Sequence, residues 1–185
     1  MATELGGVEG SDGLNSAGPL PKPKLRGKVS SDARALTLLH AYYPWLPTEE
    51  TVRPSEAGKA AKAARLEEII SQYVDLKDYL LHTVFGRDVE LSSEGKLFAT
   101  SAASDPTHVV FAANEFPYAI EQGNHFILWF CVRDKPKSDE EITRDIEREL
   151  ARLLNSTESF DFAWYENPHM SVPEFYHVQV FWVSA

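Results

Sequence analysis

The spacing of apolar residues changes from a helical to a strand period near residue 107, and this change constrains the fold most. Before it, residues 55–73 and 75–86 place apolar side chains at every third or fourth position, which is typical of amphipathic helices. After it, "HVVFAAN" (108–114) and "HFILWFC" (125–131) are rich in β-branched and aromatic residues, as strands are. The sequence therefore predicts an α+β fold with helices first and a sheet second.

Two or three helices are predicted in residues 30–86. The first begins near Ser30 and is stopped by Pro44, whereas the last is capped by Asp75 and ended by Gly86. The stripe predicted to be buried on the middle helix consists of Ala63, Leu66, Ile69, Ile70 and Tyr73. A polar connector is expected over residues 87–107.

The sheet core is predicted over residues 108–185 with the order β-β-α-β-β. Turn-forming Pro117 and Gly123 separate the first two strands, which favours an antiparallel hairpin. A helix follows with a capping box formed by Ser138 and Glu141. Its predicted buried stripe is Ile142, Ile146, Leu150, Leu153 and Leu154, and its charges between Asp139 and Glu149 are expected on a solvated face. The last two strands are "SFDFAWY" (159–165) and "HVQVFWV" (177–183), so the sheet is mainly antiparallel.

Composition sets the domain organisation. With 185 residues and 43% hydrophobic content the chain can bury one good core, which indicates a single domain over residues 30–185. Residues 1–29 are rich in Gly, Ser and Pro, so a disordered tail is predicted there. Its basic residues are Lys22, Lys24, Arg26 and Lys28, which fit a solvated linker or a docking segment.

Charge and apolar content exclude several partners. A net charge of −10 argues against nucleic acid and anionic membranes as partners, because both bind basic surfaces. No apolar run approaches the roughly 18 residues that a membrane span requires. The N-terminal residues lack a signal-peptide pattern, so we expect the cytoplasm or the nucleus. The single Cys131 excludes an intrachain disulfide, and no cofactor is predicted.

The stretch "ENPHMSVPEFYHVQVFW" (166–182) concentrates polar residues beside an apolar strand. Because side chains alternate along a strand, His177, Gln179 and Phe181 share one face. Burying an unpaired amide costs about 1–3 kcal/mol, so Gln179 either has a partner or lines a pocket. His177 is the candidate catalytic residue, with a structural histidine as the alternative. Asn167 and His169 lie in the preceding loop and are candidate ligand contacts.

A second group of candidates surrounds the predicted hairpin. Asn114 follows a strand and is either a turn-forming residue or a ligand contact. Phe116 and Tyr118 are candidates to stack on a flat ligand. His125 opens the next strand and is either a capping or surface residue or a ligand contact. The histidines lack the tight spacing of a metal site, so no metal is predicted.

Two segments carry a family resemblance. "ANEFPYAIEQGNHFILWF" and "WYENPHMSVPEFYHV" resemble an uncharacterised family that includes the fungal N-acetylglucosamine-induced proteins. The resemblance covers about residues 30–185. It implies a family without an established reaction.

The order of elements is more distantly similar to the histidine-triad and galactose-1-phosphate uridylyltransferase superfamily. This resemblance implies a pocket for a nucleotide or phosphorylated sugar and a histidine nucleophile that forms a covalent nucleotidyl intermediate. If His177 takes the first histidine position, Gln179 stands where the nucleophile should be, and an amide cannot form that intermediate. If the register slips by two residues, His177 is the reactive base and Gln179 resembles a phosphate-orienting amide.

Three functions stay open on the sequence. The first is binding of a nucleotide or phosphorylated sugar in a histidine-triad-like pocket. The second is a non-catalytic interaction or sensor protein with a degenerate site. The third is a nucleotidyl transferase or hydrolase that uses His177. Whether the protein is an enzyme is therefore undecided at this level.

Overall fold

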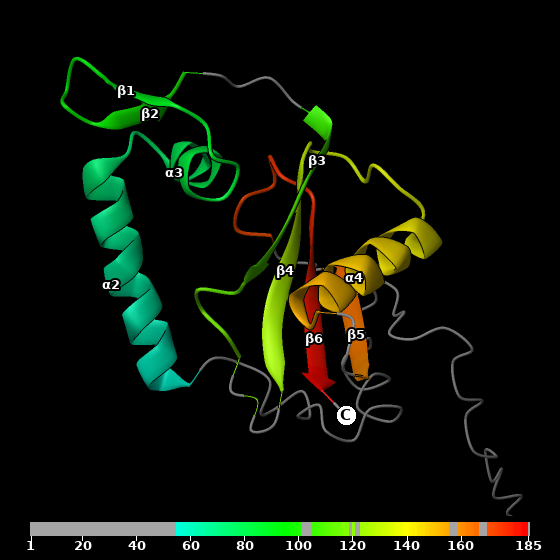
Figure 1. Ribbon diagram of the computed structural model, residues 1–185. Helices are drawn as coiled ribbons and strands as arrows, with labels where there is room; N and C mark the ends of the chain where they lie inside the picture. Colours follow the sequence, from blue (N-terminus) through cyan, green and yellow to red (C-terminus); the bar gives the residue numbers. More distant parts are fainter. Residues whose placement is uncertain are drawn as a thin grey trace, which may run out of the picture.

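A computed structural model describes residues 55–100, 105–118, 120, 123–155, 159–166 and 170–184. The predicted tail over residues 1–29 and the helix predicted near residue 30 lie outside this part of the chain. In the described part, a four-stranded sheet lies between helix α4 on one side and helices α2 and α3 on the other (Figure 1). The α+β prediction is confirmed.

The four strands of the main sheet are all antiparallel to their neighbours. They are β3 (Asp105–Ala113), β4 (Asn124–Cys131), β5 (Phe160–Glu166) and β6 (His177–Ser184), in the order β3-β4-β6-β5. The predicted hairpin is β3 with β4, and the chain passes through α4 (Asp139–Leu153) before it adds β5 and β6. The predicted order β-β-α-β-β is thus confirmed.

Local signals in the sequence set the ends of the helices. α2 (Glu56–Gln72) and α3 (Leu76–Thr83) precede the sheet, and the Asp75 side chain caps α3 by accepting a hydrogen bond from the backbone N–H of Asp78 at 2.8 Å. The predicted capping box of Ser138 and Glu141 opens α4. Gly86 adopts a φ of +64°, which only glycine takes without strain, just beyond the end of α3.

The connector predicted over residues 87–107 contains a small hairpin instead, so that prediction is wrong in part. It consists of β1 (Val89–Leu91) and β2 (Leu97–Ala99), which are antiparallel. These strands are too short for an alternating pattern to show in the sequence. The hairpin is tied to the end of α2, because Nζ of Lys96 donates to the carbonyl of Ile70 at 2.8 Å.

The two faces of the sheet carry two hydrophobic cores. Along β6, Val178 and Val180 point toward α4, whereas His177 and Gln179 point toward α3. The core under α4 contains Leu128, Phe130, Ile142, Ile146, Leu150, Phe162, Trp164, Tyr176, Val178, Val180 and Trp182. The core on the other face contains Ile69, Tyr73, Tyr79, Leu80, Leu81, Phe85, Ile127, Trp129, Cys131, Val172 and Phe175.

Three predictions about helix faces are wrong. Leu153, the last residue of α4, is 48% exposed, whereas Leu154 packs against the core as predicted. Ile70 is 53% exposed, and Ala63 is exposed as well, so the buried face of α2 is narrower than predicted. Asp145 is buried and pairs with Lys137 and Arg148, so it does not belong to a solvated face. Within the described residues, no helix is long and apolar enough to cross a membrane.

Candidate functional site

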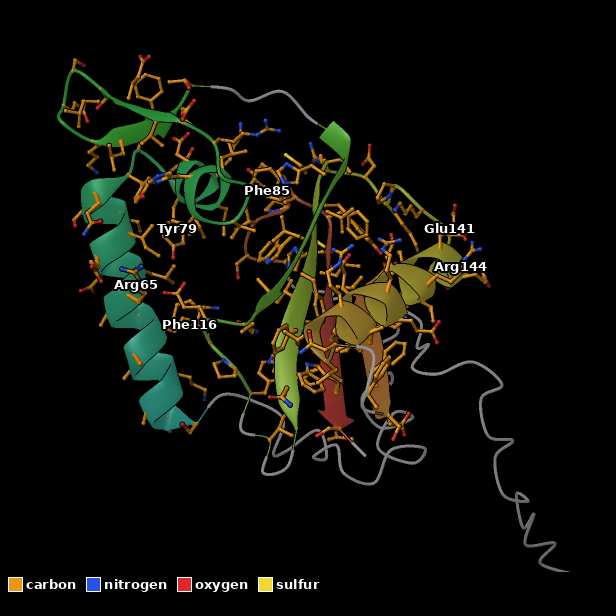
Figure 2. The ribbon with its side chains drawn as sticks, in the orientation of Figure 1. Arg65, Tyr79, Phe85, Phe116, Glu141 and Arg144 are labelled. Carbon is orange, nitrogen blue, oxygen red and sulfur yellow. The ribbon has the colours of Figure 1, made fainter. Side chains whose placement is uncertain are left out.

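A cavity of about 340 Å³ lies between the sheet and the two helices α2 and α3. Its floor is the buried face of β4 and β6, formed by Ile127, Trp129, His177 and Gln179. Its rim is formed by Lys62 of α2 and by Glu115 and Phe116, which follow β3. Arg65 of α2 pairs with Glu115 but does not line the cavity. Figure 2 shows Tyr79 and Phe116 between α2 and the sheet, and Arg65 on α2. The rest of the wall consists mainly of aliphatic side chains from α2, α3 and β3.

A chain of hydrogen bonds fixes the orientation of Gln179 in the floor. The backbone N–H of Tyr118 donates to Nδ1 of His125 at 3.0 Å, so this nitrogen carries no hydrogen. The hydrogen is therefore on Nε2, which lies 2.5 Å from Oε1 of Gln179 and donates to it. Gln179 lines the cavity, and with its oxygen engaged by His125 its amide nitrogen has no hydrogen-bond acceptor among the described residues.

His125 lies behind Gln179 and does not line the cavity. Its ring is 5% exposed and packs between Tyr118 and Phe181, with ring centroids 4.7 and 4.5 Å away. Burial lowers the pKa of His125 to about 4, and the hydrogen bond to Gln179 opposes this shift. The ring is therefore neutral at neutral pH, as the assignment of its single hydrogen to Nε2 requires. A ligand contact was predicted for His125, but its side chain contacts Gln179 and does not reach the cavity.

His177 faces the cavity directly from the floor. Its Nδ1 lies 2.9 Å from the carbonyl oxygen of Phe175, which can only accept, so Nδ1 carries the hydrogen. Its Nε2 then holds a lone pair. Burial lowers the pKa of His177, which keeps this lone pair free at neutral pH. The floor thus presents one hydrogen-bond donor, from Gln179, and one acceptor, from His177.

Asn114 forms the predicted turn and also lines the cavity, where its contact with a ligand stays a prediction. Its Oδ1 accepts from the backbone N–H of Phe116 at 2.9 Å, which forms the turn after β3. Its Nδ2 lies 3.5 Å from Oε1 of Gln179, and the residue lines the cavity. Phe116 and Tyr118 also line the cavity. The ring of Tyr118 packs on His125, so Phe116 is the freer of the two for stacking on a ligand.

Asn167 and His169 lie outside the described residues, so their predicted contacts with a ligand stay predictions. Ser171 and Val172, from the same segment, border the cavity. The structure thus brings Asn114, Phe116, Tyr118, His177 and Gln179 to one cavity.

The rim contains residues that the sequence did not single out. Nε of Arg65 lies 2.8 Å from Oε1 of Glu115, and the hydroxyl of Tyr79 donates to Oε2 of the same carboxylate at 3.0 Å. Hydrogen bonds to Glu115 and Glu68 raise the pKa of Arg65, so it is fully charged. Nζ of Lys62 lies 5.8 Å from the ring centroid of Phe116. The one feature of the sequence that could have pointed to Lys62 and Arg65 is their position on the predicted helix next to the apolar residues Leu66 and Ile69.

His125 and His177 lie too far apart to share a metal ion. His177 is opposite Trp129, and His125 is opposite Phe181, four residues further along β6. Four residues of a strand span roughly 13 Å. Among the residues that the structure describes, no group of three His, Cys, Asp or Glu side chains is placed to hold a metal.

Comparisons with known proteins assign no function. No protein-family model matches the chain, and no curated protein matches it significantly. A solved structure described as the crystal structure of HTC1 is 20% identical, with a TM-score of 0.43, over 83% of this chain and 84% of that chain. So weak a similarity carries no functional conclusion. The resemblances to the fungal N-acetylglucosamine-induced proteins and to the histidine-triad superfamily stay predictions.

Proposed function

We propose that the protein binds a small molecule, a nucleotide or a phosphorylated sugar, in the cavity between the sheet and helices α2 and α3. The observation that carries this proposal is the pair of oriented polar groups in the floor, the amide nitrogen of Gln179 and Nε2 of His177. Apolar walls with a few oriented polar groups are the common composition of ligand sites.

The orientation of Gln179 distinguishes a ligand site from a buried polar residue with a purely structural role. A buried glutamine that served packing alone would be expected to satisfy both ends of its amide within the protein. Here His125 holds the oxygen, and no described residue accepts from the nitrogen at hydrogen-bond distance. A ligand carbonyl or hydroxyl oxygen is a suitable acceptor for this nitrogen.

Catalysis by His177 is the second candidate. Its hydrogen bond to the carbonyl of Phe175 fixes the tautomer, and its lowered pKa keeps Nε2 unprotonated at neutral pH. Such a nitrogen can act as a nucleophile toward phosphorus or as a general base. Hydrolysis of a nucleotide ester or nucleotide sugar that wild-type protein shows and His177→Gln lacks would support this candidate.

A thermal-shift screen tests binding. Nucleotides, nucleotide sugars and sugar phosphates would be added to the full chain and to Gln179→Met and His177→Ala. A ligand at a hundred times its Kd stabilises the fold by about 2.7 kcal/mol, and both substitutions should reduce the shift. If no compound shifts the wild-type unfolding temperature, the proposed ligand class is wrong.

Thr143→Val is the matched control for that screen. The hydroxyl of Thr143 accepts from Nε1 of Trp164 at 3.0 Å on the α4 side of the sheet, and neither residue lines the cavity. The substitution removes a buried hydrogen bond, as Gln179→Met does, but leaves the cavity intact. It should lower the unfolding temperature and keep the ligand-induced shift. If the shift fell equally in both variants, lost stability would explain it and the floor would have no role.

A further inference from the structure

We propose that the ligand lies with an uncharged polar group on the floor, at His177 and Gln179, and with its anionic group at the rim, beside Lys62. This inference rests on the proposed function and specifies it. It reverses the orientation that the histidine-triad resemblance implies, in which the phosphate meets the histidine strand.

The floor offers no positive charge to an anion. Ile127 and Trp129 are apolar, and Gln179 is a neutral amide. His177 is 4% exposed, lines the cavity and holds a lone pair on Nε2. Placing a phosphate there would strip it of water without a cation to compensate, and an unpaired buried charge is very costly. A neutral group that both accepts and donates hydrogen bonds, such as an amide, a hydroxyl or a heterocycle edge, matches the floor instead.

Lys62 places a positive charge at the rim of the cavity. The carboxylate of Glu115 is paired with Arg65, which also pairs with Glu68. Lys62 lines the cavity, and among the described residues no carboxylate lies within ion-pair distance of its ammonium group, which lies 5.8 Å from the ring centroid of Phe116. Lys62 is half-buried, so an anion beside it is partly shielded from water and stays close to solvent.

The spacing along α2 places this charge over the cavity. Lys62, Leu66 and Ile69 stand four and three residues apart, so they share one helix face, and all three line the cavity. Leu66 and Ile69 cover the uncharged part of the ligand, and the ammonium group of Lys62 binds its anionic group. The ligand class that follows is a monophosphate, or a similar anion, of a neutral polar ring.

Paired titrations test the orientation. Each nucleoside 5′-monophosphate is compared with its own nucleoside, and a hexose phosphate with its hexose, by calorimetry on the full chain at low salt. Wild-type protein should prefer the phosphorylated member. Lys62→Gln should reduce this preference roughly tenfold and leave the affinity for the uncharged member unchanged. Gln179→Met should weaken both members equally, because it removes the contact to their shared neutral group.

Lys59→Gln is the matched control. Lys59 is an exposed lysine on the same helix, paired with Glu56, and it does not line the cavity. The Lys59→Gln substitution should leave the preference for the phosphorylated member unchanged. If the preference for the phosphorylated member survives Lys62→Gln but disappears in His177→Gln, the phosphate lies on the floor. That result would overturn the proposed orientation and leave the proposed function standing. If wild-type protein binds neither member of any pair, the proposed function fails, and the orientation fails with it.

Discussion

Nε2 of His125 donates a hydrogen bond to Oε1 of Gln179 at 2.5 Å, and the two residues are 54 positions apart in the sequence. The bond turns a neutral amide into an oriented donor, because it occupies one end and leaves the other for the cavity. His125 is therefore a positioning residue in the proposed site. In the proposed site, Gln179 is the group that contacts the ligand.

The stability of the protein should fall as the pH is lowered from 6.5 toward 4. The pKa of His125 is about 4 in the folded state and near 6.5 when unfolded, so the unfolded chain binds more protons between these values. The loss due to His125 is about 2 kcal/mol between pH 7 and pH 5. His177, whose pKa is also lowered, adds to it in the same direction. Urea unfolding at several pH values measures this slope, and His125→Gln should flatten it; an unchanged slope would contradict the assignment.

Gln179→Met should destabilise the fold by about 1–3 kcal/mol, because the buried N–H of His125 loses its acceptor. The side chains are similar in length, so packing changes little. Urea unfolding at pH 7.5 measures the difference. A variant as stable as the wild type would mean that another group accepts from His125.

Leu150→Ala should cost about 2–5 kcal/mol, because Leu150 is fully buried under the sheet. Leu153→Ala, the same chemical change three residues later on α4, should cost far less, because Leu153 is 48% exposed. Chemical denaturation of the two variants compares them directly. Equal losses in the free energy of unfolding would support the buried face predicted from the sequence, which included both leucines.

Ser138→Ala should cost about 1 kcal/mol, because it removes the side chain that caps α4. Thermal unfolding followed by circular dichroism measures the effect. Ser138→Asp keeps a capping oxygen and should retain most of the stability. If both variants unfold at the same temperature, the cap does not stabilise α4.

The elements were predictable because their signals are local. Asp75 and Ser138 cap the helices that follow them, and alternation assigned Val178 and Val180 to one face of β6 and His177 and Gln179 to the other. The hairpin β1–β2 escaped prediction because three-residue strands are too short to show a period.

The cavity was predictable only in part. Asn114, Phe116, Tyr118, His177 and Gln179 were singled out from the sequence, because polar or aromatic residues beside strands are unusual enough to notice. Lys62 and Tyr79 looked like ordinary helix residues. Their place at the cavity depends on how α2 and α3 pack against the sheet, and no local pattern contains that packing.

The sequence by itself determined the order of helices and strands, the helix caps and the face of β6 on which His177 and Gln179 lie. Those properties depend on backbone periods of 3.6 and 2 residues and on side chains next to one another in the chain. Only the tertiary structure decided that His125 holds the oxygen of Gln179, that Nε2 of His177 is the free nitrogen, and that Lys62 stands at the rim. These relationships join residues far apart in the chain, and their geometry exists only once the sheet has paired and the helices have packed on it.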